Sequence, residues 1–170
     1  IRAGDRVDHY ETIRRRKDGT LIDIALSVSP VRNADGTIIG ASKIARDVTA
    51  RKQAAGDAQR LAAIVESSDD AIVSKNLDGI ITSWNRGAQE LFGYTAEEAI
   101  GHSVTMLCPP ERYQEVFLHL NHARLGQRID HFETTRVRKD GERIEISLSI
   151  SPIKDADGNV IAVSAIARDM

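Results

Sequence analysis

Three polar side chains on one predicted helix have the types and spacing to bind a divalent metal ion. Glu115, His119 and His122 lie in a segment from about 111 to 125 whose apolar residues recur at helical intervals. With Tyr113 set at zero and 100° per residue, the three side chains fall at about 200°, 240° and 180°, on one face. Carboxylate and imidazole groups ligate divalent ions, but no fourth ligand is evident. We therefore keep a metal site as a hypothesis beside the commoner alternative, a solvated helix face.

The single cysteine, Cys108, is the other group with reactive chemistry. A lone cysteine excludes an internal disulfide and fits a reducing compartment. Its neighbours, Met106, Leu107 and Pro109, are apolar. We therefore predict that Cys108 is a small buried or half-buried core residue rather than a redox sensor.

Enzymatic activity and nucleic-acid binding both lack support in the sequence. There is no G-x-S-x-G elbow, Gly-rich phosphate loop, H-E-x-x-H motif or evident carboxylate pair, so we expect a chain that is not itself an enzyme. A net charge of −2 supplies no field that would gather phosphates. No apolar run reaches the roughly 20 residues that cross a bilayer. We expect a soluble, cytoplasmic chain without membrane contact, whose parent protein could be anchored elsewhere.

The chain contains one stretch twice. Residues 1–48 and 123–170 align without a gap, and 27 of the 48 positions are identical. A repeat of this length indicates duplicated structural units, and the first copy begins within a unit. His9 and His131 occupy the same repeat position beside an aromatic residue, where we predict a structural role at a strand edge.

Each repeat copy is predicted to form three antiparallel strands. In the second strand of each copy, apolar residues alternate with polar or small ones, which indicates one buried face; the apolar positions are Ile22, Ile24, Leu26 and Val28 in the first copy and Ile144, Ile146, Leu148 and Ile150 in the second. Three strands alone leave an edge and a face uncovered. We expect residues 1–48 to contact another chain or the complete domain.

A helix is predicted for residues 49–67. Its apolar residues follow the spacing of a short coiled-coil seam; they are Ala54, Ala58, Leu61 and Val65. This pattern predicts a signalling helix that pairs across a homodimer, and the alternative is a helix packed on its own domain.

Residues 68–170 are predicted to form a complete α+β domain with an antiparallel sheet and helices on one face. A hairpin at its start is followed by short helices with recognisable caps, Asn85 for the first and Thr95 with Glu98 for the second. A longer helix then presents an apolar stripe to the core; the stripe is Tyr113, Val116, Phe117, Leu120 and Ala123.

The complete domain resembles a PAS domain, the S-box sensory class, and residues 1–48 resemble the last three strands of a preceding PAS repeat. The motifs that carry the resemblance are Asp78-Gly79, Trp84-Asn85, Leu91-Phe92-Gly93-Tyr94, Glu97-Glu98, Gly101, Arg138-Lys139-Asp140-Gly141 and Ala167-Arg168-Asp169. The resemblance implies a five-stranded antiparallel sheet in the order 2-1-5-4-3, with a cavity beneath the helices. It also implies sensing or relay of signals to an output domain, commonly a histidine kinase or a cyclic-dinucleotide enzyme.

The resemblance also implies where a signal would leave each unit. Asp47-Val48-Thr49 matches the family's Asp-x-Thr junction between the last strand and the outgoing helix. Asp169 occupies the same position in the second copy, one residue before the end at Met170.

Cofactor binding of the kinds known in PAS domains has little support. A haem-binding relative would present a histidine of the long helix to the cavity, whereas the angles above direct His119 and His122 away from it. A flavin-binding relative would carry a cysteine soon after the glycine that closes the second helix, and Gly101 is followed by His102, Ser103 and Val104. We therefore regard haem as improbable and flavin as still more so, and the cofactor, if any, is unknown.

Two functions remain open from the sequence. In one, the domain binds a small molecule in its cavity and passes a conformational change to an output domain; the candidate lining residues are Ile72, Trp84, Phe117, Leu120, Ile146 and Leu148. In the other, side chains fill the cavity and the domain is a cofactor-free dimerisation or protein-interaction module. A haem-based gas or redox sensor is a further alternative.

Overall fold

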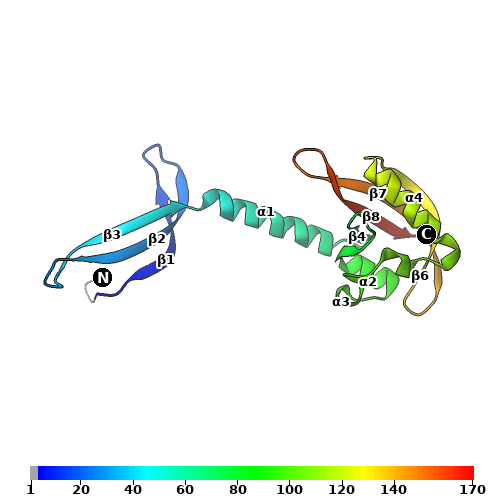
Figure 1. Cartoon of the computed structure of the whole chain (residues 1–170), viewed down its shortest axis with the longest axis horizontal. Helices are drawn as coiled ribbons and strands as arrows, with labels where there is room; N and C mark the ends of the chain where they lie inside the picture. Colours follow the sequence, from blue (N-terminus) through cyan, green and yellow to red (C-terminus); the bar gives the residue numbers. More distant parts are fainter. Residues whose placement is uncertain (1–3) are drawn as a thin grey trace. The chain divides into compact units, whose positions relative to one another are not determined.

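The computed structural model describes residues 4–170, and the chain divides into two compact units, one up to Leu61 and one from Ala62 onward. In the first unit, three strands form an antiparallel sheet in the order β1-β2-β3 (Figure 1); they are β1 (Val7–Arg15), β2 (Leu21–Arg32) and β3 (Ile38–Asp47). Asp-Gly pairs form the turns between these strands, and Gly19 and Gly36 adopt a positive φ that suits glycine. The three strands of the first copy therefore form as the alternation predicts.

Both repeat copies contain the same irregularity at the position of a histidine. His9 has φ 55° and His131 has φ 52°, an uncommon conformation for a residue with a side chain. Strand pairing shifts at the same points, between Val7 and Tyr10 and between Ile129 and Phe132. Each histidine thus lies in a β-bulge. Both strands are at a sheet edge, as predicted for this repeat position, whereas the bulge itself was not predicted.

The sheet of the first unit buries few side chains. Among its described residues, the buried apolar ones are Ile24, Val28 and Val48. Several large apolar residues of β1 and β3 are exposed, including Tyr10, Ile13 and Ile44. Much of this sheet is therefore accessible to a partner.

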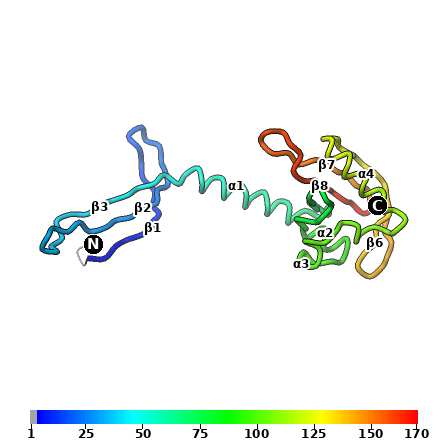
Figure 2. The backbone as a smooth tube through the Cα atoms, in the orientation of Figure 1, coloured from blue at the N-terminus to red at the C-terminus, as the bar shows by residue number. Residues whose placement is uncertain are grey.

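Helix α1 (Thr49–Glu66) follows β3 after a single residue, Val48. The backbone trace passes directly from β3 into this helix (Figure 2). None of its residues is buried, and Leu61, in the seam predicted from the sequence, is 63% exposed. A helix of 18 residues with this exposure gains little stability from packing within its own chain.

The second unit is an α+β domain with a five-stranded antiparallel sheet in the order β5-β4-β8-β7-β6. Its strands are β4 (Ala71–Lys75), β5 (Ile81–Trp84), β6 (Ile129–Val137), β7 (Arg143–Lys154) and β8 (Val160–Asp169). Counted within the domain, this is the order 2-1-5-4-3, so the predicted fold class and strand order are confirmed.

Short helices and one longer helix connect β5 to β6. They are α2 (Arg86–Phe92), α3 (Ala96–Ala99), 3₁₀ helices at Val104–Leu107 and Pro110–Arg112, and α4 (Tyr113–Arg124). Asn85 caps α2 by accepting from the Ala88 N–H, and Thr95 with Glu98 forms a capping box on α3. The predicted caps are confirmed, and they fix where the chain turns between helices.

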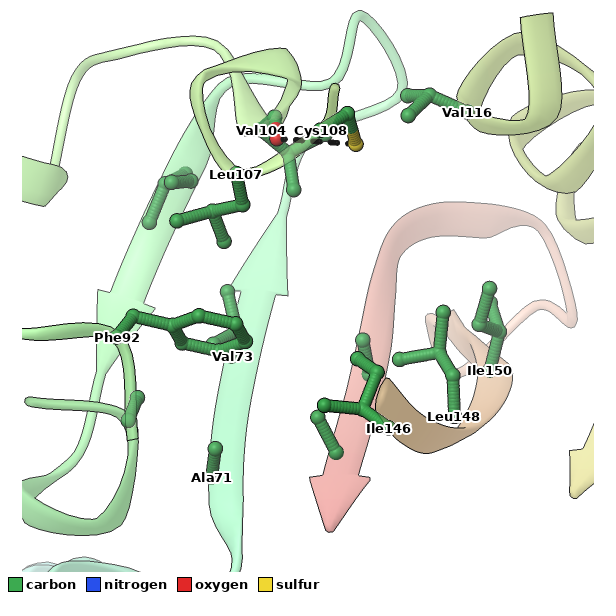
Figure 3. Close-up of a cluster of buried hydrophobic side chains, with 14 of the residues drawn as sticks. Ala71, Val73, Phe92, Val104, Leu107, Cys108, Val116, Ile146, Leu148 and Ile150 are labelled. Carbon is green, nitrogen blue, oxygen red and sulfur yellow. Dashed lines mark hydrogen bonds between the residues drawn. The ribbon is translucent and has the colours of Figure 1, made fainter. Parts of the chain in front are cut away.

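The core of this domain lies between the sheet and the helices. Val73 of β4, Ile146 and Leu148 of β7 and Val116 of α4 contribute to one buried cluster (Figure 3). Period-two alternation brings Ile144, Ile146, Leu148 and Ile150 inward, whereas Ser147 and Ser149 lie on the opposite face of β7 with partial exposure. The inner face of the sheet is therefore the one that can form a ligand cavity.

None of the helices among residues 4–170 combines the length and the apolar character that a membrane crossing requires.

Candidate ligand cavity and signal junctions

A cavity of about 40 Å³ lies inside the complete domain, between the inner face of the sheet and the helices. Strands β4, β7 and β8 contribute its floor, and α2, α4 and the segment Val104–Cys108 contribute to the other walls. Most of the lining is apolar, and the principal apolar residues are Val73, Phe92, Leu107, Val116, Ile146 and Leu148. Three nitrogen-bearing side chains also line it, namely Lys75, His119 and Arg136.

Four of the six residues proposed to line the cavity are buried in the core. Ile146 and Leu148 line the cavity directly. Trp84 and Leu120 belong to the surrounding cluster but lie outside the lining. The Trp84 Nε1–H donates to the Tyr94 carbonyl at 2.9 Å, so its polar edge is satisfied within the fold.

The other two proposed lining residues, Phe117 and Ile72, were assigned wrongly from the sequence. Phe117 is 60% exposed, because α4 turns Val116 and Leu120 inward and leaves Phe117 beside the buried stripe. Ile72 is only partly buried, because the inward positions of β4 are its neighbours Ala71 and Val73. In both cases the residue lies one position from an inward one.

His119 is the clearest departure from the sequence prediction. The helical angles direct it away from the cavity, but it is 7% exposed and lines the cavity wall. Strand β6 packs along this side of α4, and the Phe132 ring meets the imidazole edge-on at 4.9 Å between centroids. Burial, followed by the positive charges of Arg136 and Lys75, lowers the pKa of His119 to about 4. His119 is therefore a neutral core residue at physiological pH.

Lys75 is a cavity residue that the sequence reasoning missed. It is 4% exposed, at an inward position of β4 next but one to Val73. Burial lowers the pKa of its ammonium group to about 8. The available signal was the alternation itself, because Ala71, Val73 and Lys75 share one face of the strand.

Arg136 and Glu115 form a partly buried ion pair beside the cavity. Arg136 Nη1 donates to Glu115 Oε2 at 3.3 Å and to Thr134 Oγ1 at 2.8 Å. The other carboxylate oxygen of Glu115 accepts from Arg112 Nη1 at 2.5 Å. Hydrogen bonds from Thr134 and the two arginines outweigh burial and hold the pKa of Glu115 below its usual value.

The proposed metal ligands are not brought together. Glu115 is paired with two arginines, His119 lies in the core and His122 is exposed. Among residues 4–170, no three His, Cys, Asp or Glu side chains are grouped so that they could hold a metal ion. The helical angles placed all three ligands on one solvated face, and the packing of β6 against α4 divides that face.

Cys108 is buried, and its thiol donates weakly to the Val104 carbonyl at 3.8 Å (Figure 3). Burial raises the pKa of this thiol, which disfavours the reactive thiolate. A haem group does not fit the cavity, because 40 Å³ is far below the roughly 300 to 1,000 Å³ of ordinary ligand pockets. His119 lies in the cavity wall and could in principle ligate iron, but the cavity is still too small for haem.

The first predicted signal junction joins β3, β2 and the start of α1. Thr49 Oγ1 donates to Asp47 Oδ1 at 2.6 Å and accepts from the Asp23 N–H of β2 at 2.9 Å. Asp47 also forms an ion pair with Arg16 at 2.7 Å. The structure thus brings Asp47 and Thr49 into direct contact, and it ties the first turn of α1 to the sheet.

The second predicted junction residue, Asp169, ends β8 and lies 3.8 Å from Arg138 Nη2. Its neighbour Arg168 forms a two-pronged ion pair with Asp70, at 2.9 and 2.6 Å. The repeat alignment pairs Arg138 with Arg16 and Asp169 with Asp47, so the two junctions share one arginine–aspartate arrangement. The arginine–aspartate distance is longer at the second junction, 3.8 Å compared with 2.7 Å at the first.

Asn85 connects the end of α1 to the complete domain. Its Nδ2 donates to the carbonyls of Val65 and Asp70, at 2.8 and 3.0 Å. Its Oδ1 accepts from the N–H groups of Ile72 and Ala88, both at 2.9 Å. The side chain is buried, and both of its amide hydrogens are donated in hydrogen bonds. The sequence identified Asn85 as a helix cap and missed this second role.

Comparison with known proteins assigns most of the chain to known families. Residues 59–170 match the family described as "PAS fold", and residues 1–50 match a second family described as "PAS domain". A solved PAS domain of a protein from Colwellia psychrerythraea superposes with a TM-score of 0.61 at 29% identity. The superposition covers 67% of this chain and 97% of that one.

Two curated proteins are more distantly similar. The chain is 24% identical over 173 residues to biofilm dispersion protein BdlA of Pseudomonas aeruginosa, covering 97% of this chain and 40% of that protein. It is 22% identical over 173 residues to phytochrome 1 of Adiantum capillus-veneris, covering 91% of this chain and 16% of that protein. The chain therefore spans less than half the length of either relative.

Proposed function

The chain belongs to the PAS family, and on this premise we propose that it is a cytoplasmic sensory and signal-relay module of a longer signal-transduction protein. The chain itself is not catalytic in this proposal. The enzyme that answers the signal, such as a histidine kinase or a cyclic-dinucleotide enzyme, belongs to another part of the parent protein. The observation that carries the proposal is the internal cavity, whose walls include β8, the strand that ends at the junction residue Asp169.

The input in this proposal is a small molecule bound in the cavity. Leu148 of β7 and Ala165 of β8 line the cavity and belong to paired strands, so a ligand that displaces one strand displaces the other. Strand β8 then carries the change to Asp169 and, through the Arg168–Asp70 ion pair, toward the segment between α1 and β4. The ligand acts by favouring one of two packings of nearly equal free energy.

A cofactor-free dimerisation or protein-interaction module is the second candidate. The small volume of the cavity favours it, because further inward movement of side chains would close a space of 40 Å³. In that case α1 would carry the function by pairing with a second copy.

Leu148→Trp separates the two candidates, because the larger side chain occupies the cavity. Native mass spectrometry of the wild-type chain as purified is expected to show a retained small-molecule mass, and the variant is expected to lose it. Ile161→Trp is the matched control, since it enlarges an exposed isoleucine of β8. A bare wild-type mass, with Leu148→Trp losing about 1 to 3 kcal/mol of unfolding free energy through overpacking alone, would favour the interaction module.

A further inference from the structure

The unpartnered ammonium group of Lys75 in the apolar cavity carries an inference about the ligand. We propose that the cavity binds a small monocarboxylate, with its carboxylate against Lys75 Nζ and its short apolar body against Val73, Ile146 and Leu148. This inference rests on the proposed sensory function and names the ligand class.

Lys75 has no counter-ion within the part of the chain that the structure describes. Its side chain lines the cavity, and among residues 4–170 burial and the charges of Cys108 and Arg136 act on its ammonium group without a hydrogen bond. Its partners across the sheet, Ile81 on β5 and Val163 on β8, are apolar. Lysine is rarely buried without a partner, because an unpaired charge in an apolar interior is strongly unfavourable. An anion in the cavity would remove that cost.

The other titratable groups around the cavity leave its net charge positive. Arg136 is neutralised by Glu115, and Glu115 is shared with Arg112, so no carboxylate remains for Lys75. His119 is neutral at physiological pH because burial lowers its pKa to about 4. Burial raises the pKa of Cys108, so its thiol stays protonated. The neutral imidazole of His119 can still offer one hydrogen bond to a carboxylate oxygen.

The size and polarity of the walls restrict the anion. A cavity of 40 Å³ has room for roughly three water-sized groups, which is close to the size of acetate; propionate, one carbon larger, requires a small outward shift of the walls. A phosphate or dicarboxylate would place a second charge against apolar walls without a second free cation, because Arg136 is already paired. A monocarboxylate with one to two apolar carbons matches both the charge and the lining.

Calorimetric titration of the full chain with sodium propionate tests the inference. Propionamide has nearly the same shape without the charge, and sodium chloride at matched ionic strength controls for screening. Propionate is expected to bind at least tenfold more tightly than propionamide. Lys75→Met keeps an apolar side chain of similar length, and we expect it to lose this preference and to melt at a higher temperature than the wild type without ligand. Lys154→Met is the control at an exposed lysine.

A pH series supplies a readout that a purely structural lysine would not change. Lys75 faces Cys108, Arg136 and His119, and its own pKa of about 8 predicts that propionate affinity is constant from pH 6 to 7.5. Above pH 8 the affinity is expected to fall roughly tenfold per pH unit in the wild type, because the free ammonium group loses its proton. Lys75→Met is expected to show no such fall.

Equal binding of propionate and propionamide, or unchanged propionate binding in Lys75→Met, would overturn the role assigned to Lys75. No carboxylate binding, together with a different retained mass in native mass spectrometry, would reject the ligand class and leave the sensory function standing. No carboxylate binding with a bare protein mass would reject both this inference and ligand sensing.

Discussion

His119 is an imidazole buried in a cationic environment, and its titration affects how the complete domain responds to acid. The groups that face it are Arg136 on β6, Lys75 on β4, and Glu115 and His122 on its own helix. Burial and the two nearest cations lower its pKa from 6.5 to about 4, and Glu115 opposes them only in part. The folded domain therefore resists protonation of this side chain.

The sign of the pH effect follows from this lowered pKa. Between pH 6.5 and 4 the unfolded chain binds a proton at His119 and the folded chain does not, so stability falls as the pH falls through that window. The loss should approach about 3 kcal/mol near pH 4, since each unit of pKa corresponds to about 1.4 kcal/mol. Urea unfolding at a series of pH values measures this effect. The free energy of unfolding of His119→Gln is expected to change less with pH over this range than that of the wild type.

His122→Gln is the matched control, because His122 is exposed on the same helix. Its free energy of unfolding should change with pH as that of the wild type does. If His119→Gln and the wild type lose stability in parallel between pH 6.5 and 4, then another group is responsible for the acid response.

The polar residues of the cavity were harder to predict from the sequence than the apolar ones. Ile146 and Leu148 follow from period-two alternation within β7, which is a local property of the chain. The burial of His119 depends on β6 packing beside α4, a contact between segments that no local periodicity contains. The alternation along β4 directs Lys75 inward, but it was not assigned to the cavity because a lysine is rarely found in a core.

At the scale of secondary structure, local signals predicted most elements correctly. The caps at Asn85 and Thr95 and the turns at glycines with positive φ determine where helices and strands end. The close approach at Gly87 was not predictable, because a Cβ there would lie 2.3 Å from the Asp70 carbonyl oxygen of the preceding segment. Elements are thus encoded locally, whereas their contacts depend on residues distant in sequence.

Asn85 is expected to hold the end of α1 against β4, β5 and α2 through its two amide hydrogens. Asn85→Asp retains the acceptor for Ile72 and Ala88 but loses both donors, and it places a carboxylate against the carbonyls of Val65 and Asp70. Unpaired buried carbonyls and a repelled charge should reduce the free energy of unfolding by about 2 to 4 kcal/mol. Hydrogen exchange should also accelerate in the last turn of α1.

Asn76→Asp is the control for this substitution. Asn76 uses only its Oδ1, which accepts from the N–H groups of Asp78 and Ile80, and Asp155 makes the same kind of turn in the β7–β8 connection. The control should therefore change stability by less than about 0.5 kcal/mol. Similar exchange rates in α1 for both variants would show that Asn85 does not couple the helix to the domain.

At the scale of the whole molecule, the aligned strands β8 and β3 have similar sequences but differ in burial. In the complete domain, the inward residues of β8 are buried; these are Val163, Ala165 and Ala167. The aligned residues of β3 are exposed; these are Ala41, Lys43 and Ala45. Ile44 on β3 is 69% exposed, and α1 has no buried residue. Apolar surface of this kind on a sheet and a helix is typical of protein–protein contacts.

We therefore predict that the chain forms a homodimer through α1 and the exposed strands of the first unit. Removal of residues 1–48 should weaken the dimer, because the sheet contributes apolar area and unpaired strand edges that α1 alone lacks. Light scattering over a dilution series measures the dissociation constant of each form. Leu61→Glu tests the helix separately by placing a charge in its seam, and Asp57→Glu, which retains the charge on α1, is its control. An unchanged dissociation constant after removal of residues 1–48 would assign association to α1 alone, and a monomer at every wild-type concentration would exclude both surfaces.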